Sequence, residues 1–342
     1  MYLTQAFKRA MQLEDSNTAT VCAGRVRTWN ECGKRVSKLA GALRNMGITD
    51  GERVAVLALN SDRYYEYFYA VPWAGGVFVP INIRLAPPEV AFWLNDSGTE
   101  VLFIDDNFLH ILEALKDQLE TVQEVIFMGD GPVPDGMHGY EEILAEAEAV
   151  TDALRGGDDL AGLFYTGGTT GRSKGVMLSH ANLICNSYNV IGGMRFRPGI
   201  HWLHAAPMFH IADGLAVFGV TMVTGVHIFI PTFTSEDSLK AIQEHRVSHG
   251  LFVPTMMNAL VNYPDIEQYD LSSLESVAYG ASPMPEAVIR RAMEIIPDCD
   301  FTHVYGQTEC APLSTICGPE YHVFEGPNAG RYKSAGQAAL GV

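Results

Sequence analysis

The stretch LFYTGGTTGRSKGVMLSH, residues 163–180, decides how the rest of the sequence is interpreted. It places glycines, threonines and two basic residues, Arg172 and Lys174, between an apolar run and a predicted helix with Ser179 as its N-cap. Glycine lets the backbone approach an anion and turn its N–H groups inward, and hydroxyl and ammonium groups add donors. The composition therefore favours a phosphate-binding loop over the alternative, a mobile surface turn.

The P-loop of nucleoside triphosphatases has a lysine directly after its last glycine, so that the lysine folds back over the phosphates. Here Gly171 is followed by Arg172 and Ser173, and only then by Lys174. A P-loop NTPase is therefore a competing hypothesis that the register disfavours.

Short apolar runs alternate with helix-like stretches along the whole chain, which predicts an α/β fold with parallel sheets flanked by helices. Strands are predicted at 54–59, 76–80, 101–105, 124–128, 161–166, 201–206, 226–230, 250–254, 276–280 and 301–306. Helices are predicted at 62–73, 87–95, 108–119, 140–150, 179–190, 235–245 and 285–296, with another beginning near 211. At least two sheets are expected, because open sheets rarely exceed ~10 strands. The expected subdomains are 1–155 and 156–342, with a small β-rich part at the C-terminal end.

The composition excludes several classes of function. A net charge of -17, from 40 acidic and 23 basic residues, disfavours nucleic-acid binding. The N-terminus lacks the apolar core of a signal peptide, so a cytoplasmic location is expected. Six cysteines without a C-x-x-C pair indicate reduced thiols and no zinc site. Residues 211–230 imitate a membrane span, but Asp213, His227 and glycines favour a buried helix followed by a strand.

Residues 165–175 resemble the phosphate-binding signature of the adenylate-forming enzymes, which include acyl-CoA synthetases, luciferases and peptide-synthetase adenylation domains. Three further stretches resemble this superfamily's motifs, in its order: PMFHIADG (207–214), YGASPMP (279–285) and VYGQTECAP (304–312). The resemblance extends over essentially all 342 residues. Gly167 departs from the serine or threonine that is frequent there, and Ser173 from a frequent proline.

The resemblance implies the large N-terminal domain of an acyl-CoA synthetase-like fold and an AMP-forming acid–thiol ligase. Such an enzyme joins a carboxylate to the α-phosphate of ATP, releases pyrophosphate, and passes the acyl group to coenzyme A. The implied ligands are therefore ATP, Mg²⁺, coenzyme A and a small carboxylic acid. The apolar stretch 202–219 favours a fatty or aromatic acid, and Asp213 does not match the aspartate that meets an amino group in peptide-synthetase domains.

The resemblance also assigns roles to residues. The phosphate-binding residues would be Thr166, Gly167, Gly168, Thr169, Thr170, Gly171 and Lys174. The adenine- and acyl-binding residues would be Gly280, Ala281, Ser282, Tyr305 and Gly306. The catalytic residues would be His210, Thr308 and Glu309, with Glu309 as the magnesium ligand and Thr308 donating to the α-phosphate. His210 would orient the acid rather than act as a base, because a carboxylate is already ionised at neutral pH.

Other histidines raise the alternative of a metal site. His201 and His204 fall three apart on a predicted strand, so they should point to opposite faces. His245 and His249 span a predicted helix end, where a solvated position is expected.

The C-terminal sequence KSAGQAALGV looks like a family segment that precedes a mobile C-terminal domain, which is absent from this sequence. The expectation is therefore a truncated ligase core with little or no adenylation activity. The alternative is a non-catalytic nucleotide- and acyl-binding protein derived from the ligase fold. The oligomeric state stays open, with a homodimer among the options.

Overall fold

The computed structural model describes residues 1–167 and 171–342. The chain divides into two compact units: unit 1 is Met1–Asn17 with Thr28–Ile184, and unit 2 is Thr18–Arg27 with Cys185–Val342. Each unit is built around its own β-sheet, in agreement with the two sheets expected. The division differs from the expected subdomain boundary at 155/156, because β8 (Leu160–Thr166) pairs with β4 (Val77–Pro80) inside unit 1.

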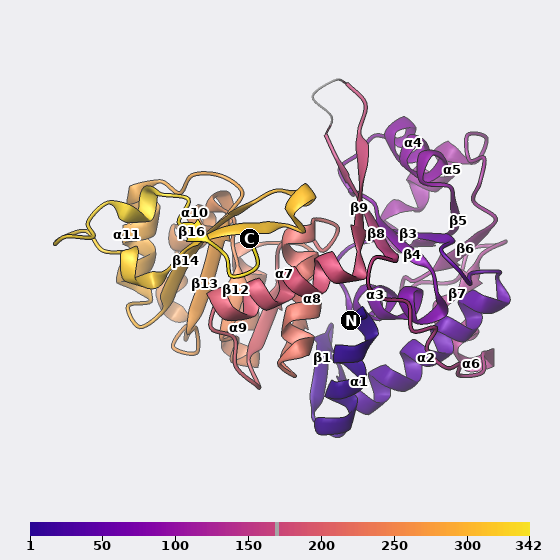
Figure 1. Ribbon diagram of the computed structural model, residues 1–342, viewed down its shortest axis with the longest axis horizontal. Helices are drawn as coiled ribbons and strands as arrows, with labels where there is room; N and C mark the ends of the chain where they lie inside the picture. Colours follow the sequence, from indigo (N-terminus) through magenta and orange to yellow (C-terminus); the bar gives the residue numbers. More distant parts are fainter. Residues whose placement is uncertain (168–170) are drawn as a thin grey trace. The chain divides into compact units, whose positions relative to one another are not determined.

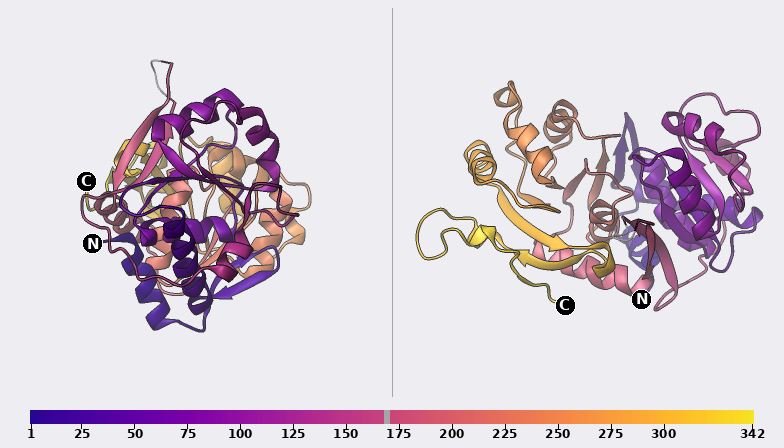
Figure 2. Two further views of the ribbon diagram at one scale, coloured as in Figure 1. Left: turned by 90° about the vertical axis from the view of Figure 1, so that its right-hand side faces the viewer. Right: turned by 90° about the horizontal axis from the view of Figure 1, so that it is seen from above.

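Unit 1 is a sheet with helices on both faces (Figures 1 and 2). In the described residues its seven strands lie in the order β7-β6-β5-β3-β4-β8-β9, and every pair is parallel except β8–β9. The remaining strands are β3 (Arg53–Leu57), β5 (Thr99–Ile104), β6 (Glu124–Phe127), β7 (His138–Gly139) and β9 (Lys174–Ser179). The helices are α1 (Leu3–Leu13), α2 (Trp29–Asn45), α3 (Asp62–Ala74), α4 (Pro87–Ser97), α5 (Leu109–Leu115) and α6 (Tyr140–Glu146).

The two faces of this sheet are covered by different helices. Aromatic residues of α3 pack against the sheet on one face, as where Phe68 meets Phe78 with ring centroids 5.2 Å apart. On the other face, α4 and α5 contribute Trp93, Leu94 and Ile111 to a separate apolar cluster. Burial of both faces explains why these strands are continuous apolar runs in the sequence.

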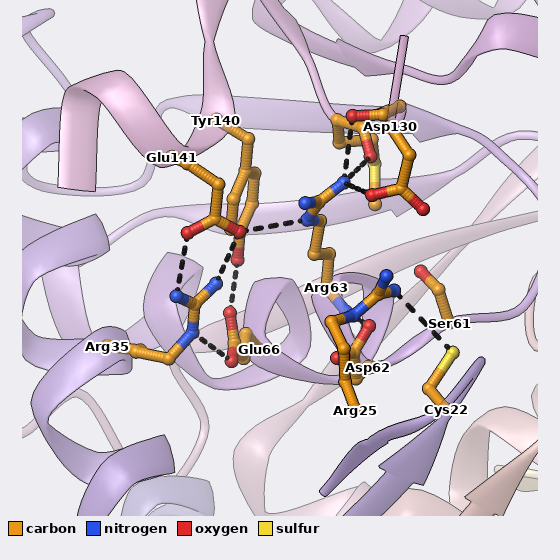
Figure 3. A network of polar contacts seen from close by, with 12 residues as sticks. Cys22, Arg25, Arg35, Ser61, Asp62, Arg63, Glu66, Asp130, Tyr140 and Glu141 are labelled. Carbon is orange, nitrogen blue, oxygen red and sulfur yellow. Dashed lines mark hydrogen bonds and ion pairs between the residues drawn. The ribbon is translucent and has the colours of Figure 1, made fainter. Parts of the chain in front are cut away.

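A network of charged side chains joins α2, α3 and α6 within unit 1 (Figure 3). Arg35 contacts Glu66 at 2.6 Å and binds both carboxylate oxygens of Glu141, at 2.8 and 2.9 Å. Tyr140 donates to Glu66 at 2.7 Å, and Arg63 contacts Glu141 at 3.1 Å. Burial alone would raise the pKa of Glu141, but hydrogen bonds and charges from Arg35 and Arg63 lower it to about 2. We call these five residues the charged network.

The sequence suggested that the glycine-rich loop leads directly into a helix, but it does not. It connects β8 to a second strand, β9, which pairs antiparallel with β8 so that Thr166 lies opposite Lys174. The strand forms because its side chains alternate, with Leu178 buried and Met177 exposed. Ser179 then caps the helix as predicted, since its Oγ accepts the N–H of Asn182 at 3.2 Å.

Unit 2 is also a mostly parallel sheet between helices. In the part of the chain that is described, its nine strands lie in the order β16-β15-β14-β13-β12-β10-β11-β1-β2. They are β1 (Thr18–Cys22), β2 (Arg25–Thr28), β10 (His201–His204), β11 (Val226–Phe229), β12 (His249–Leu251), β13 (Ser276–Gly280), β14 (Asp300–Gly306), β15 (Leu313–Cys317) and β16 (Gln337–Ala338). The helices are α8 (Ile211–Met222), α9 (Ser235–His245), α10 (Pro254–Val261) and α11 (Glu286–Ile295), while α7 (His180–Gly193) contains the unit boundary.

Two features of unit 2 bear on the sequence analysis. The antiparallel strands β15 and β16 form the β-rich part expected near the C-terminus. The apolar stretch 211–230 folds as α8 followed by β11, as predicted. Throughout the described ranges, no helix combines the length and the apolarity needed to cross a membrane. All six cysteines are free thiols, and Cys22, Cys32, Cys299 and Cys317 are buried.

Candidate active site

An apolar cavity of about 110 Å³ opens at the carboxyl ends of the unit 2 strands. Ligands commonly bind at this edge of a parallel sheet. Four predicted adenine- and acyl-binding residues line the cavity together: Gly280, Ala281, Tyr305 and Gly306. Its other walls come from α7, α8 and neighbouring strands: Val190, Met194, Trp202, Ala212, Leu215, Ala216, Leu251, Val253, Val304, Pro312 and Leu313. Ser282, His210, Thr308 and Glu309 are not among the lining residues.

Two glycines at this edge are required by close backbone approach. A Cβ on Gly280 would collide with the carbonyl oxygen of Val304, and one on Gly306 would collide with that of Pro312. Ala281 follows in the left-handed region with φ 66°. The chain therefore turns tightly at the ends of β13 and β14, and the resulting backbone forms part of the cavity wall.

The loop that carries Thr308 and Glu309 is held by a residue that the sequence analysis missed. Asn186, buried on α7, donates to the carbonyl oxygens of Cys310 and Leu313 at 3.0 and 2.9 Å. Its Oδ1 accepts the N–H of Leu313 at 3.0 Å. The available signal was an asparagine in the middle of a helix, where this residue type is unfavourable unless its side chain has specific partners.

Glu309 fits the role of a ligand for a hard cation. It lies on the short helix Thr308–Cys310 and is exposed, and it makes no ion pair or side-chain hydrogen bond with any residue outside the undescribed gap at 168–170. A carboxylate in that condition suits Mg²⁺, which usually takes one or two protein carboxylates and keeps several waters. Apart from that gap, no three His, Cys, Asp or Glu side chains converge as a metal cluster.

His210 stands at the start of α8. Its carbonyl oxygen accepts the N–H groups of Asp213 and Gly214 at 3.2 and 2.9 Å, so the residue is the N-cap of the helix. Its exposed imidazole rests against Phe209, with ring centroids 4.3 Å apart. The side chain is therefore held next to a helix N-terminus, a position that favours an anionic partner.

In unit 1, the predicted phosphate-binding residues occupy the hairpin between β8 and β9. Thr166 ends β8 and Lys174 begins β9, while Gly171 has φ 95°, a conformation natural for glycine. Gly168, Thr169 and Thr170 lie outside the described residues. Around Gly167 a Cβ would meet no described atom within 4 Å, so packing does not impose glycine there.

Helix α4 anchors the base of this hairpin, which the sequence analysis did not foresee. The ring of Tyr165 stacks on Trp93 at 4.7 Å, and its hydroxyl donates to Asp96 at 2.7 Å. Burial and the Asp96 carboxylate together raise the pKa of Tyr165. The guanidinium of Arg172 lies 5.7 Å from the ring of Phe92 on the same helix. The available signal in the sequence was an aromatic residue on the predicted strand and others on the predicted helix, which could stack on one another.

The remaining histidines do not gather as a metal site. His201 contacts the carbonyl oxygen of His245 at 2.7 Å, whereas His204 contacts Asp213 at 2.8 Å, so the two point to opposite faces as expected. The expected solvated position is wrong for His249, because it begins the buried strand β12. Burial lowers the pKa of His249 to about 4.

Comparison with known proteins agrees with this architecture. The chain is 35% identical to a feruloyl-CoA synthase of Amycolatopsis sp over 89% of its length, which corresponds to 59% of that protein. It is 32% identical to a long-chain-fatty-acid–CoA ligase of Thermus thermophilus, covering 84% of this chain and 52% of the other. The N-terminal domain of FACL13 from Mycobacterium tuberculosis superposes with a TM-score of 0.88 at 29% identity, covering 99% of this chain and 82% of that one. The chain thus spans little more than half the length of these two ligases.

The model of one family, AMP-binding enzyme, matches residues 7–342. That match covers almost the whole chain and includes all four stretches that carry the sequence resemblance. The protein therefore belongs to the AMP-binding enzyme family, whose members among its relatives are acyl-CoA and fatty-acid–CoA ligases.

Proposed function

We propose that this protein is the core of an ATP-dependent carboxylate–CoA ligase that forms an acyl-adenylate and then an acyl-CoA thioester. The observation that carries the proposal is the apolar cavity of unit 2, which is lined in part by Gly280, Ala281, Tyr305 and Gly306. An apolar pocket lined by the backbone at the ends of β13 and β14 suits an acid with an apolar body.

The nucleotide would be bound by two groups of residues. The hairpin residues Thr166, Gly167, Gly171 and Lys174, with the loop residues between them, would bind the phosphates that leave as pyrophosphate. In the described ranges, the ammonium of Lys174 has no ion pair and is exposed. Tyr305, which lines the cavity and is 54% exposed, would stack on the adenine base.

The reacting groups would be positioned by three side chains. Glu309 would hold Mg²⁺, which supplies charge neutralisation between the phosphates when bound. Thr308 would donate its hydroxyl to the α-phosphate. His210 would orient the acid carboxylate from the N-terminus of α8, because orientation of two anions is the main obstacle to their reaction.

The acid would be aromatic or fatty. Relatives with these two specificities are named for ferulate and for long-chain fatty acids, and both kinds of acid have an apolar body. The cavity walls carry no charged side chain, which agrees with either kind. Coenzyme A would accept the acyl group.

Binding and single-turnover measurements test this function. Calorimetric titration of the 342-residue chain with Mg·ATP and with benzoate or decanoate should show binding of both ligand classes. Acyl-adenylate formation and pyrophosphate exchange by the same chain then test catalysis. The variant Glu309→Gln should lose the Mg²⁺ dependence of nucleotide binding, with Glu294→Gln as an exposed control. Adenylate formation, even over hours, would exclude the non-catalytic alternative, whereas failure to bind Mg·ATP would overturn the ligase proposal.

A further inference from the structure

Five buried side chains in unit 2 form a continuous hydrogen-bonded series behind the cavity. The indole N–H of Trp202 donates to Oδ1 of Asp213 at 3.2 Å, and Nδ1 of His204 contacts Oδ2 of the same carboxylate at 2.8 Å. Nε2 of His204 lies 2.9 Å from Nδ1 of His227, whose Nε2 lies 3.1 Å from the hydroxyl of Thr221. All five side chains are at most 1% exposed. We call them the histidine network.

The sheet register explains why these residues meet. Strands β10 and β11 are parallel, with Trp202 opposite His227 and His204 opposite Phe229. These side chains share one face of the sheet because alternate residues point the same way. Asp213 and Thr221 reach that face from α8, and Asp213 stands in its first turn, where the helix dipole favours a negative charge.

When both imidazoles are neutral, the donors and acceptors run in one direction along the series. Trp202 can only donate, so Asp213 accepts there, and its other oxygen accepts from Nδ1 of His204. With both imidazoles neutral, His204 accepts at Nε2 from His227, which accepts at Nε2 from Thr221. Burial and the neighbouring imidazole hold the pKa of His227 well below its usual value, in keeping with a neutral ring. Every bond of the series is then satisfied, and the series ends at the indole.

That indole belongs to a residue of the cavity wall. Trp202 and Leu215 are each 1% exposed, whereas Tyr305 on the same wall is 54% exposed. Asp213 sits between the lining residues Ala212 and Leu215 on α8. An apolar cavity of about 150 Å³ can hold benzene. At about 110 Å³, this cavity is sized for a compact group rather than an extended chain.

We infer that Asp213 is a positioning residue for acid selection: by fixing the Trp202 indole in the cavity wall, it keeps the acyl pocket small and favours compact acids over extended ones. The inference rests on the proposed function, because it assigns the cavity to the acyl group. His204, His227 and Thr221 hold Asp213 in turn. Asp213 itself touches no substrate, so its effect passes through Trp202.

The direction of the series gives a test that ordinary destabilisation would not reproduce. In Asp213→Asn, the amide oxygen still accepts from Trp202 and the amide N–H donates to His204, so both imidazoles switch tautomer and His227 donates to Thr221. Asp213→Asn alone should therefore change the ratio of benzoate to decanoate affinity by less than about threefold. Thr221→Val alone should change this affinity ratio by a similarly small factor. In the double variant, His227 would donate its N–H toward a methyl group at position 221. That donor would have no acceptor, so the hydrogen-bonded series would be broken.

The expected result for the double variant is a shift of about tenfold or more in the affinity ratio toward decanoate. The indole N–H resonance of Trp202, assigned with Trp202→Phe in ¹⁵N-tryptophan-labelled protein, should move strongly only in the double variant. Trp202→Phe should itself shift the ratio, and adding the other two substitutions to it should change the ratio no further. Ser273→Ala, which removes another buried hydroxyl of unit 2, is the control for lost packing.

The outcomes separate the two proposals. Suppose that the unsubstituted protein binds acids normally, but that the affinity ratio and the indole resonance of the double variant are unchanged or equal the sum of the two single effects. The role of Asp213 is then overturned, and the ligase proposal stands. If the unsubstituted protein binds no acid, the proposed function fails, and the assignment of the cavity fails with it. If the double variant does not fold, the response of the ratio to Trp202→Phe decides the question: an unchanged ratio overturns the inference.

Discussion

The two units each bury a polar network, and the two networks differ in chemistry. The charged network of unit 1 relies on arginine, which stays protonated at every relevant pH, paired with Glu66 and Glu141. The histidine network of unit 2 has one carboxylate, Asp213, and otherwise imidazole, indole and hydroxyl groups. Fixed charges suit ionic contacts that hold helices together. Hydrogen bonds whose direction can reverse suit the wall of a ligand pocket. The comparison implies that disrupting the first costs stability and disrupting the second alters ligand choice.

The largest expected effect tests the structural half of this comparison. Glu66→Ala removes a fully buried carboxylate that contacts Arg35 and Tyr140, and it should lower the free energy of unfolding by about 3–5 kcal/mol. Urea-induced unfolding measures this loss. Glu236→Ala breaks an exposed pair with Lys240 and should leave stability almost unchanged, because solvent screens the pair. If Glu66→Gln, which preserves the shape, changes the benzoate to decanoate ratio, the comparison is broken.

A neutral contact in unit 2 provides the next test. Asn186→Leu would remove three hydrogen bonds to the loop that carries Thr308 and Glu309, and should lower stability by about 2–3 kcal/mol. It should also weaken Mg·ATP binding more than ATP binding in EDTA, which calorimetry can measure. Asn189→Leu, one turn further along α7 and also buried, is the matched control. Equal effects of the two variants on Mg·ATP would remove the positioning role of Asn186.

The pH dependence of unfolding should separate the buried histidines of unit 2 from the charged network of unit 1. Burial lowers the pKa of His249 to about 4, and burial with the neighbouring His204 holds the pKa of His227 well below its usual value, so the unfolded state binds protons first as pH falls below about 6.5. Stability should therefore decrease by about 1.4 kcal/mol for each such histidine by pH 5.5. Glu141, with a pKa of about 2, contributes stability that is lost only below about pH 4.5. His249→Gln should flatten the slope between pH 7 and 5.5, and an unaltered slope would contradict this assignment.

The smallest effect concerns the hairpin of unit 1. Tyr165→Phe removes the hydrogen bond to Asp96 but keeps the stacking on Trp93, so stability should fall by only about 0.5–1.5 kcal/mol. A modest loss of ATP affinity should accompany it, whereas Glu66→Gln should leave ATP affinity unchanged. Together, these two results would show that the hairpin of unit 1 affects ATP binding whereas its charged network does not. Tyr188→Phe, at an exposed position, is the control.

Sequence reasoning recovered the alternation of strands and helices because burial on both faces of parallel sheets leaves strong apolar runs. Helix 235–245 and strand 276–280 were predicted with the bounds that the structure has. It missed β9, because a glycine-rich turn with a following lysine resembles a strand-to-helix loop as closely as a hairpin. It also missed Asn186 and the contact of Tyr165 with α4, because such contacts join segments far apart in sequence.

The motif residues were recognisable by resemblance, and the structure adds how some of them are held. Gly280 and Gly306 are explained by backbone approach, which no local pattern displays. The histidine network was equally hidden: Asp213 was considered only as a partner for an amino group and His204 only as a metal ligand. Their contact depends on the register of β10 and β11 and on the start of α8.

The placement of β1 has a consequence for how the protein can be made. Thr20 pairs with His227, so β1 and β2, which lie near the N-terminus, join a sheet whose remaining strands are translated much later. During synthesis, β1 must wait on the ribosome for its partner, and such non-local pairing slows folding. A recombinant fragment that starts after residue 28 would leave β11, with its apolar sequence VHIF, as an open edge able to recruit strands from other molecules. A fragment designed to express unit 2 in isolation should therefore include residues 18–27, joined to the rest by a linker.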